Sequence, residues 1–150
     1  MKTAMATRRQ VLTTTAGLAG ALWLRPASAS AEELAAAIAA FAGGAPVKAG
    51  RVMLDVAPLV ENGNVVPVTV TVQSPMSATD HVKAIAIFNE RNPQRDVAVF
   101  GLGPRAGRAT VATRIRLATS QQLVAVAKMN DGSCWTHTVD VIVTLAACVE

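Results

Sequence analysis

From residue 46 onward, the sequence alternates between short apolar runs and clusters of turn-forming residues. In the run 66–73, a valine at every second position from Val66 to Val72 predicts a strand with one buried face. The runs that predict strands are 52–56, 66–73, 84–89, 97–100, 108–118, 123–129 and 135–145. About seven short strands around an aliphatic core predict an all-β fold, an immunoglobulin-like β-sandwich.

A different pattern precedes the strands. Residues 31–42 (AEELAAAIAAFA) predict one short N-terminal α-helix, which Gly43 and Gly44 end. Leu34, Ile38 and Phe41 recur at helical spacing and form an apolar stripe. The stripe can pack on its own domain or on another chain, and the pattern alone favours neither.

The first 30 residues read as a targeting segment. Arg8 and Arg9 stand directly before an apolar stretch, 11–24, and small residues follow at 27–31. This order predicts a twin-arginine signal peptide over 1–30, with ordinary Sec export as the alternative, and therefore a periplasmic protein. The stretch is shorter than the roughly 20 residues of a membrane-spanning helix, so we expect no membrane span.

The charge balance follows from the same segment. The chain has 14 basic and 10 acidic residues, and four of the basic ones lie in the first 30 residues. The remaining chain, with 10 of each sign, is formally neutral. The net charge of +4 therefore gives no indication of a nucleic-acid partner.

The last predicted strand divides its side chains between two faces. The set with Trp135, His137 and Val141 is expected to face mainly the core, and the set with Cys134 mainly solvent or an interface. Beyond this strand, residues 146–150 (AACVE) have no turn or cap, so we expect a helix-plus-sandwich domain over 31–145 and a mobile tail that carries Cys148.

Two cysteines in an exported protein raise the question of a disulfide. Cys134 and Cys148 would lie about 40 Å apart if the run between them is one extended strand, far beyond the separation that a disulfide bridges. We therefore expect two free thiols. Cys134 is interpreted as a small buried hydrophobe at a subunit contact, with an intermolecular disulfide or a regulatory thiol as the alternatives.

An exposed thiol on a mobile tail suits a carrier better than a catalyst. Cys148 would move relative to any fixed base, so it would be poorly activated by its own chain. A substrate attached to it could be presented to active sites on other proteins. An incidental free thiol is the alternative that the chemistry alone leaves open.

An ordered set of short motifs runs through the predicted sandwich. The motifs are Glu61-Asn62-Gly63, Val66-Pro67-Val68, Ser74-Pro75, Asp80-His81-Val82-Lys83, Ile87-Phe88, Asn92-Pro93, residues 113–118 (TRIRLA), Met129, Asp131-Gly132-Ser133 and Trp135. In this order they resemble the SoxY family, the sulfur-carrier subunits of bacterial thiosulfate oxidation, and the resemblance extends from about Pro46 to Cys148.

The resemblance implies a sandwich that pairs with a second sandwich subunit, SoxZ, and no catalytic activity, cofactor or metal of its own. It implies that a c-type cytochrome pair joins thiosulfate to Cys148. A hydrolase then releases sulfate, and a molybdenum–haem sulfane dehydrogenase oxidises the remaining sulfur.

The tail departs from the family pattern. The family has Gly-Gly-Cys-Gly-Gly, whereas this chain has Ala146, Ala147, Cys148, Val149 and Glu150. Alanine keeps a small cross-section but loses backbone freedom, and Val149 adds stiffness. This departure affects how the tail enters the active sites of the usual partner enzymes.

Two other functions stay open. The chain could be a divergent interaction subunit that pairs with a sandwich partner without carrying sulfur. Cys134 and His137, with His81 and Met129, could also form a blue-copper site of an electron carrier. Against copper, Cys134 and His137 are three residues apart and face opposite sides of one strand.

Overall fold

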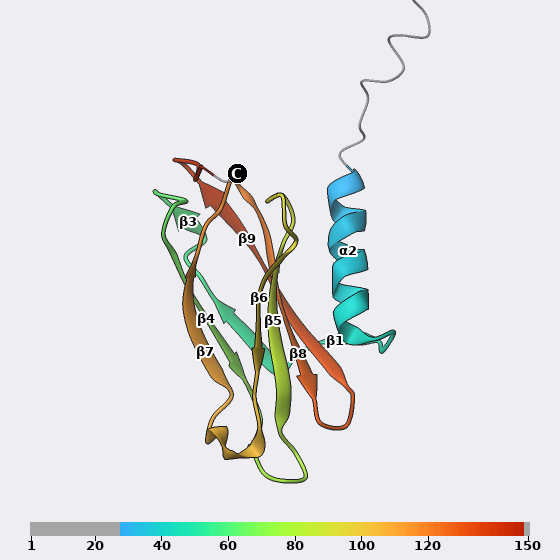
Figure 1. Cartoon of the computed structure of the whole chain (residues 1–150). Coiled ribbons are helices and arrows are strands. Elements are labelled where there is room, and N and C mark those ends of the chain that lie inside the picture. Colours follow the sequence, from blue (N-terminus) through green and yellow to red (C-terminus); the bar gives the residue numbers. More distant parts are fainter. Residues whose placement is uncertain (1–27, 149–150) are drawn as a thin grey trace, which may run out of the picture.

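A computed structural model describes residues 28–148 of the 150-residue chain, and within them two β-sheets pack face to face beside one α-helix (Figure 1). The larger sheet has the order β1 (Val47–Ala49), β9 (Cys134–Val143), β8 (Gln121–Met129), β5 (Val82–Asn89) and β6 (Asp96–Gly101), and β3 (Leu59–Val60) also pairs with β9. The smaller sheet has the order β2 (Val52–Asp55), β4 (Val66–Val72) and β7 (Thr110–Ile115). The predicted immunoglobulin-like sandwich with an N-terminal helix is confirmed.

The structure adds two short strands to those predicted. β1 and β3 both pair parallel with β9, with Val47 opposite Cys134 and Leu59 opposite Ile142. These two segments are strands because they pair with β9, and neither has an apolar alternation long enough to predict a strand. The predicted strand 135–145 also ends earlier, at Val143.

The main core lies between the two sheets. In β4, the side chains from Val66 to Val72 are buried at every second position, as the alternation predicted. Ile85 and Ile87 of β5 and Leu123 of β8 complete this core from the larger sheet. Burial of aliphatic side chains on both inner faces stabilises the sandwich.

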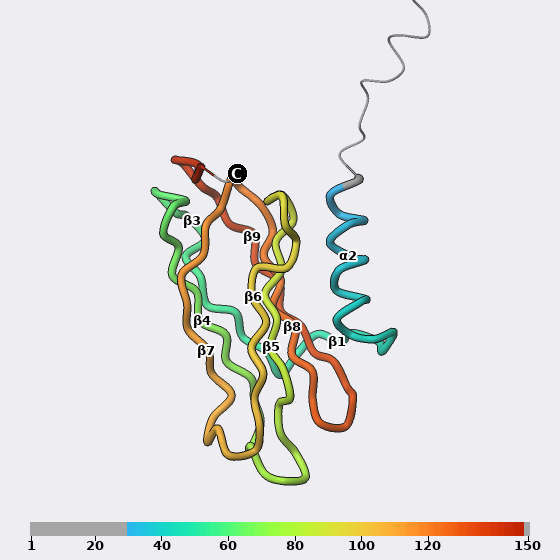
Figure 2. The backbone as a smooth tube through the Cα atoms, viewed as in Figure 1, coloured from blue at the N-terminus to red at the C-terminus, as the bar shows by residue number. Residues whose placement is uncertain are grey.

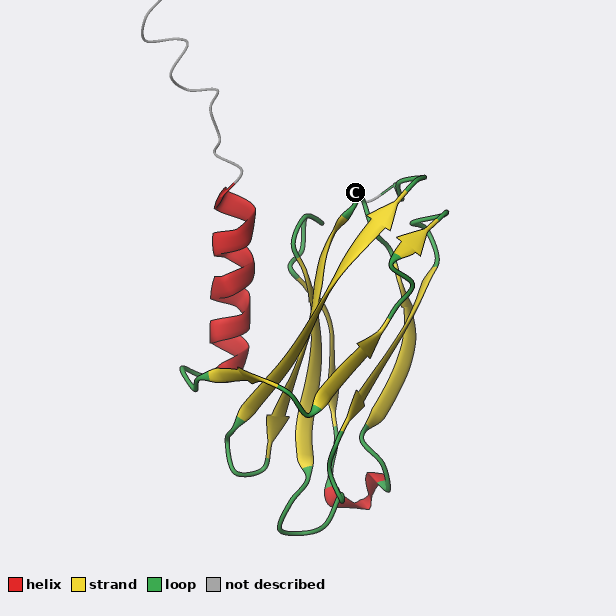
Figure 3. Cartoon of the chain, turned by 180° about the vertical axis from the view of Figure 1, so that it is seen from behind, coloured by secondary structure: helices red, strands yellow, loops and turns green. Residues whose placement is uncertain are grey.

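A second core covers the outer face of the larger sheet. Helix α2 (Ser28–Ala42) begins three residues before the predicted start and lies along this face (Figure 3). Leu34 is buried there, and Phe41 contacts Phe88 of β5 edge to face with ring centres 5.9 Å apart. The apolar stripe therefore packs on its own domain. Because β5 and β8 are covered on both faces, their apolar runs are nearly continuous.

Two glycines end the helix. Gly43 and Gly44 have φ values of 64° and 82°, the left-handed conformation that commonly follows the last helical turn. None of the helices in residues 28–148 has the length and apolar character that crossing a membrane requires. The predicted signal peptide over 1–30 lies largely outside the described residues.

Candidate functional site

The segment that follows β9 lies at one end of the sandwich, close to the turn after β3 and to the connection from β7 to β8 (Figure 2), and Cys148 is the last described residue of this segment. β9 ends at Val143, and the chain then bends instead of continuing as an extended strand. The Thr144 N–H donates to the Val60 carbonyl at 3.0 Å, and the Thr144 hydroxyl donates to the Glu61 carbonyl at 3.1 Å. These bonds fasten the end of β9 to the turn after β3.

The next residues of the tail are also attached to the sandwich. The Leu145 carbonyl accepts a hydrogen bond from the Gly63 N–H at 2.8 Å, and the Ala147 N–H donates to the Leu117 carbonyl at 3.0 Å. Ala146 is exposed, whereas Ala147 retains only 7% of its surface exposure. The structure thus differs from the expected tail that leaves the domain at Ala146, because backbone pairing reaches Ala147.

Cys148 is the first residue past these attachments, and its side chain is exposed. No hydrogen bond or ion pair within residues 28–148 involves its thiol. Within the described residues, no side chain is placed as a hydrogen-bonded base for this sulfur. Val149 and Glu150, which flank it, lie outside the described residues.

Cys134 has the opposite environment. It is 1% exposed at the start of β9, beneath α2, and its thiol donates weakly to the Gly132 carbonyl at 3.8 Å. Burial raises the pKa of the Cys134 thiol above its ordinary value. The predicted burial is confirmed, but a helix of its own chain covers this cysteine where a subunit contact was expected.

The candidate copper ligands do not come together in the structure. The Leu54 N–H donates to Nδ1 of His137 at 3.0 Å, so one ring nitrogen already accepts a hydrogen bond, while Cys134 lies on the helix-covered face. His81 lies in the loop before β5, where its Nδ1 contacts the Ser77 carbonyl at 3.0 Å. In the described part of the chain, no three His, Cys, Asp or Glu side chains lie together so as to hold a metal ion.

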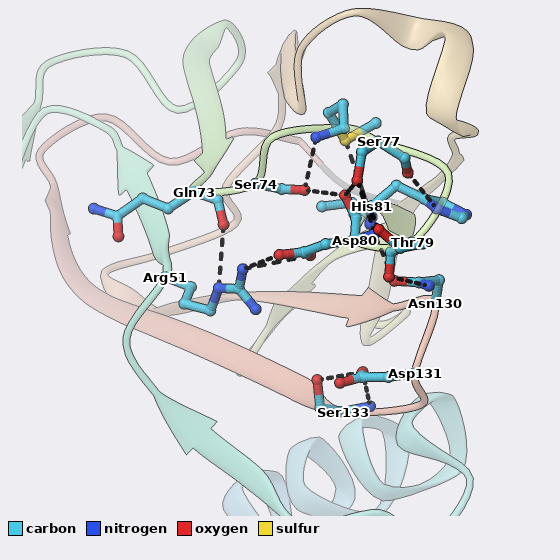
Figure 4. Close-up of polar contacts among 12 residues, drawn as sticks. Arg51, Gln73, Ser74, Ser77, Thr79, Asp80, His81, Asn130, Asp131 and Ser133 are labelled. Atoms are coloured by element: carbon cyan, nitrogen blue, oxygen red, sulfur yellow. Dashed lines mark hydrogen bonds and ion pairs between the residues drawn. The ribbon is translucent and has the colours of Figure 1, made fainter.

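A polar network occupies the end of the sandwich opposite Cys148 (Figure 4). The Arg51 guanidinium forms an ion pair with Asp80 at 3.2 Å and donates to the Gln73 carbonyl at 3.1 Å. Hydrogen bonds from the hydroxyl and N–H of Ser133 lower the pKa of Asp131. Several motif residues of this end therefore shape loops and do not approach Cys148.

The residues that hold the tail were not among the candidate site residues. Gly63 and Asn92 belong to motifs that resemble the family, and the structure shows that Gly63 bonds the tail directly and that Asn92 bonds the segment around Leu117. The φ of Gly63 lies outside the left-handed region, so a turn requirement does not explain this glycine. Only the folded arrangement shows that three distant segments meet there.

Comparisons with known proteins agree with this architecture. The family described as "Sulfur oxidation protein SoxY" matches residues 38–148. The structure of the sulfur carrier protein SoxY from Chlorobium limicola f thiosulfatophilum is 32% identical, with a TM-score of 0.65 over 77% of this chain and 99% of that chain. A search of the curated proteins gives no match.

More distant structures share the fold alone. The superoxide reductase (neelaredoxin) from Ignicoccus hospitalis is 18% identical, with a TM-score of 0.56 over 63% of this chain and 80% of that chain. The superoxide reductase from Nanoarchaeum equitans is 11% identical, with a TM-score of 0.54 over 64% and 100%. The family match covers most of the chain and ends at Cys148, and the 32% identity extends across the sandwich. This chain therefore belongs to the SoxY family of sulfur oxidation proteins.

Proposed function

We propose that this chain is a covalent carrier of thiosulfate-derived sulfur and that the sulfur attaches to Cys148. The family and the similar structure, which is that of a sulfur carrier protein, support the carrier role. The observation that carries the choice of residue is the contrast between the two thiols. Cys148 is exposed at the end of the sandwich, whereas Cys134 is buried beneath α2.

The loading reaction is an oxidation. The Cys148 thiol loses its proton, and its sulfur forms a bond with the outer sulfur of thiosulfate, which gives a cysteine S-thiosulfonate. Two electrons leave in this step, and a c-type cytochrome pair accepts them. The carrier supplies the thiol and its presentation, and the partner supplies the oxidant and the activation of the thiol.

Later steps belong to other partners. A hydrolase adds water to the terminal sulfonate group and releases sulfate, which leaves a sulfane sulfur on Cys148. A sulfane dehydrogenase oxidises that sulfur further. In this proposal the chain is exported to the periplasm, has no catalytic activity of its own and pairs with a SoxZ-like sandwich subunit.

Intact-mass measurement tests the proposal. The full chain is incubated with thiosulfate and the oxidising cytochrome pair, and we expect it to gain the mass of one thiosulfate-derived adduct. The Cys148→Ala variant should gain nothing, while Cys134→Ala should load like the unaltered chain. A chain that pairs with a SoxZ-like subunit but never gains mass is a non-carrier interaction subunit, and this result would contradict the proposal.

A further inference from the structure

Three segments that are far apart in the sequence meet directly below Cys148. The Gly63 N–H donates to the Leu145 carbonyl at 2.8 Å, and the Gly63 carbonyl accepts from the Leu117 N–H at 2.8 Å. The Leu117 carbonyl in turn accepts from the Ala147 N–H at 3.0 Å. We call this arrangement of Gly63, Leu117, Leu145 and Ala147 the tail junction. It joins the turn after β3, the segment after β7 and the tail through backbone atoms alone.

The junction has room only for glycine at position 63. A Cβ atom there would lie 2.4 Å from the Leu117 carbonyl oxygen, 3.0 Å from the Ala147 nitrogen and 3.1 Å from the Leu145 oxygen. All three are backbone atoms, which cannot move aside as the end of a flexible side chain can. Gly63 is buried and its φ is not left-handed, so the close approach of the tail is what requires a glycine here.

The middle segment of the junction is held from two sides. The Leu117 side chain is completely buried in the main core. The Asn92 side chain donates to the Arg116 carbonyl at 2.8 Å and accepts from the Ala118 N–H at 3.1 Å, so it bonds the residues on both sides of Leu117. Gln121, itself buried, donates to Asn92 at 2.7 Å. The carbonyl that anchors Ala147 is therefore fixed to the sandwich.

We infer that the tail junction positions Cys148 for loading, with Gly63 and Asn92 as positioning residues. This inference rests on the proposed carrier function. With Ala147 anchored, Cys148 is the first residue beyond the fixed backbone, so the free chain reaches about 3.5 Å instead of the roughly 10 Å of an arm that is free from Ala146 onward. The sulfur therefore stays close to the end of the sandwich, and partner enzymes approach that end.

Two measurements on the full chain, with Gly63 and Asn92 unaltered, test the anchoring directly. Amide hydrogen exchange should show a protected Ala147 N–H. A nitroxide label on Cys148, in a Cys134→Ala background, should show restricted motion. Exchange of the Ala147 amide at the rate of an unstructured peptide, or motion of the label as free as on such a peptide, would overturn the inference whether or not the variants at Gly63 and Asn92 fold.

Variants then test the positioning residues. Gly63→Ala should speed exchange of the Ala147 amide about tenfold or more, because one anchoring hydrogen bond is lost, while amides of the central strand β8 keep their protection. Asn92→Ala should act in the same direction without any steric change at position 63. Gly101→Ala is the matched control, because a Cβ at Gly101 meets no atom within 4 Å.

Loading distinguishes positioning from a purely structural effect. For Gly63→Ala we expect the rate of adduct formation on Cys148 to fall about tenfold or more relative to Gly101→Ala, because small misplacements of a reacting group slow its reaction strongly. An unchanged loading rate together with a released Ala147 amide would overturn the positioning role. The exchange and label measurements contain no thiosulfate, so failure of the anchoring is distinguishable from failure of the carrier function.

Discussion

At the scale of single residues, the two cysteines illustrate how surroundings separate two chemically identical groups. Cys134 is covered by α2 and its pKa is raised by burial, so its thiol is both inaccessible and less ionised at a given pH. Cys148 is exposed beyond the last anchored residue. One thiol is therefore part of a core, and the other is open to solvent.

Alkylation rates measure this difference. In the native chain, iodoacetamide should modify Cys148 at least about tenfold faster than Cys134, because the thiolate is the reacting form and must be accessible. Because the pKa of the Cys134 thiol is raised, its alkylation rate should increase with pH over a higher pH range than the rate of an ordinary thiol does. Peptide mass spectrometry over a time course follows both sites. Equal rates in the native chain would contradict the structure, while equal rates in denaturant are expected.

Gly63 shows what could not be predicted at this scale. The sequence indicates a turn at Asn62-Gly63, and the structure does have turn residues there. The reason for the glycine is the approach of Leu117, Leu145 and Ala147, which lie more than fifty residues away along the chain. A local pattern contains no information about such an approach, so the anchored tail was expected to be free.

At the scale of elements, helix α2 is the part whose existence was predictable and whose position was not. The apolar stripe and the two glycines predicted a helix that ends at Ala42, and the structure confirms that end. A stripe specifies which side chains are buried, but not which surface covers them. In the structure the outer face of β5 and β8 covers the stripe, since both strands have apolar side chains on both faces.

Loosening α2 should expose Cys134. Phe41→Ala removes the edge-to-face contact with Phe88 and should weaken the docking of α2 on the sheet by about 1–2 kcal/mol. We therefore expect faster alkylation of Cys134, with the rate at Cys148 unchanged. Glu32→Ala, at an exposed position of the same helix, is the control. An unaltered Cys134 rate in Phe41→Ala would mean that something other than α2 protects this thiol.

At the scale of the whole molecule, the two ends of the sandwich differ in structure. The tail junction and Cys148 occupy one end, and the network of Arg51, Asp80 and neighbouring loops occupies the other (Figures 1 and 4). Both ends contain motifs that resemble the family. The resemblance alone therefore does not separate residues that build loops from residues that present the reactive sulfur.

Substitution at the distant end should leave loading intact. Arg51→Ala breaks a partly exposed ion pair and a hydrogen bond to the Gln73 carbonyl, so it should lower the free energy of unfolding by about 1–2 kcal/mol. The rate of adduct formation on Cys148 should match that of Arg108→Ala, which removes an exposed arginine. Denaturant unfolding and intact-mass time courses provide the two readouts. A large loss of loading in Arg51→Ala would place a part of the functional surface at the wrong end.

The overall architecture was predictable because most strands carry a pattern of their own. Alternating valines in β4 and nearly continuous apolar runs in β5 and β8 identify strands wherever their partners lie. β1 and β3 have three and two residues and exist through pairing with β9, so no local pattern indicates them. Long-range pairing accounts both for these strands and for the tail junction.

The most direct test of the carrier function is tandem mass spectrometry of this chain, isolated with its thiol adducts intact from cells that are oxidising thiosulfate. We expect fragment ions that locate thiosulfate-derived sulfur on Cys148 and an unmodified Cys134. Adducts confined to Cys134, or a Cys148 thiol that is never modified while thiosulfate is consumed, would contradict the assignment.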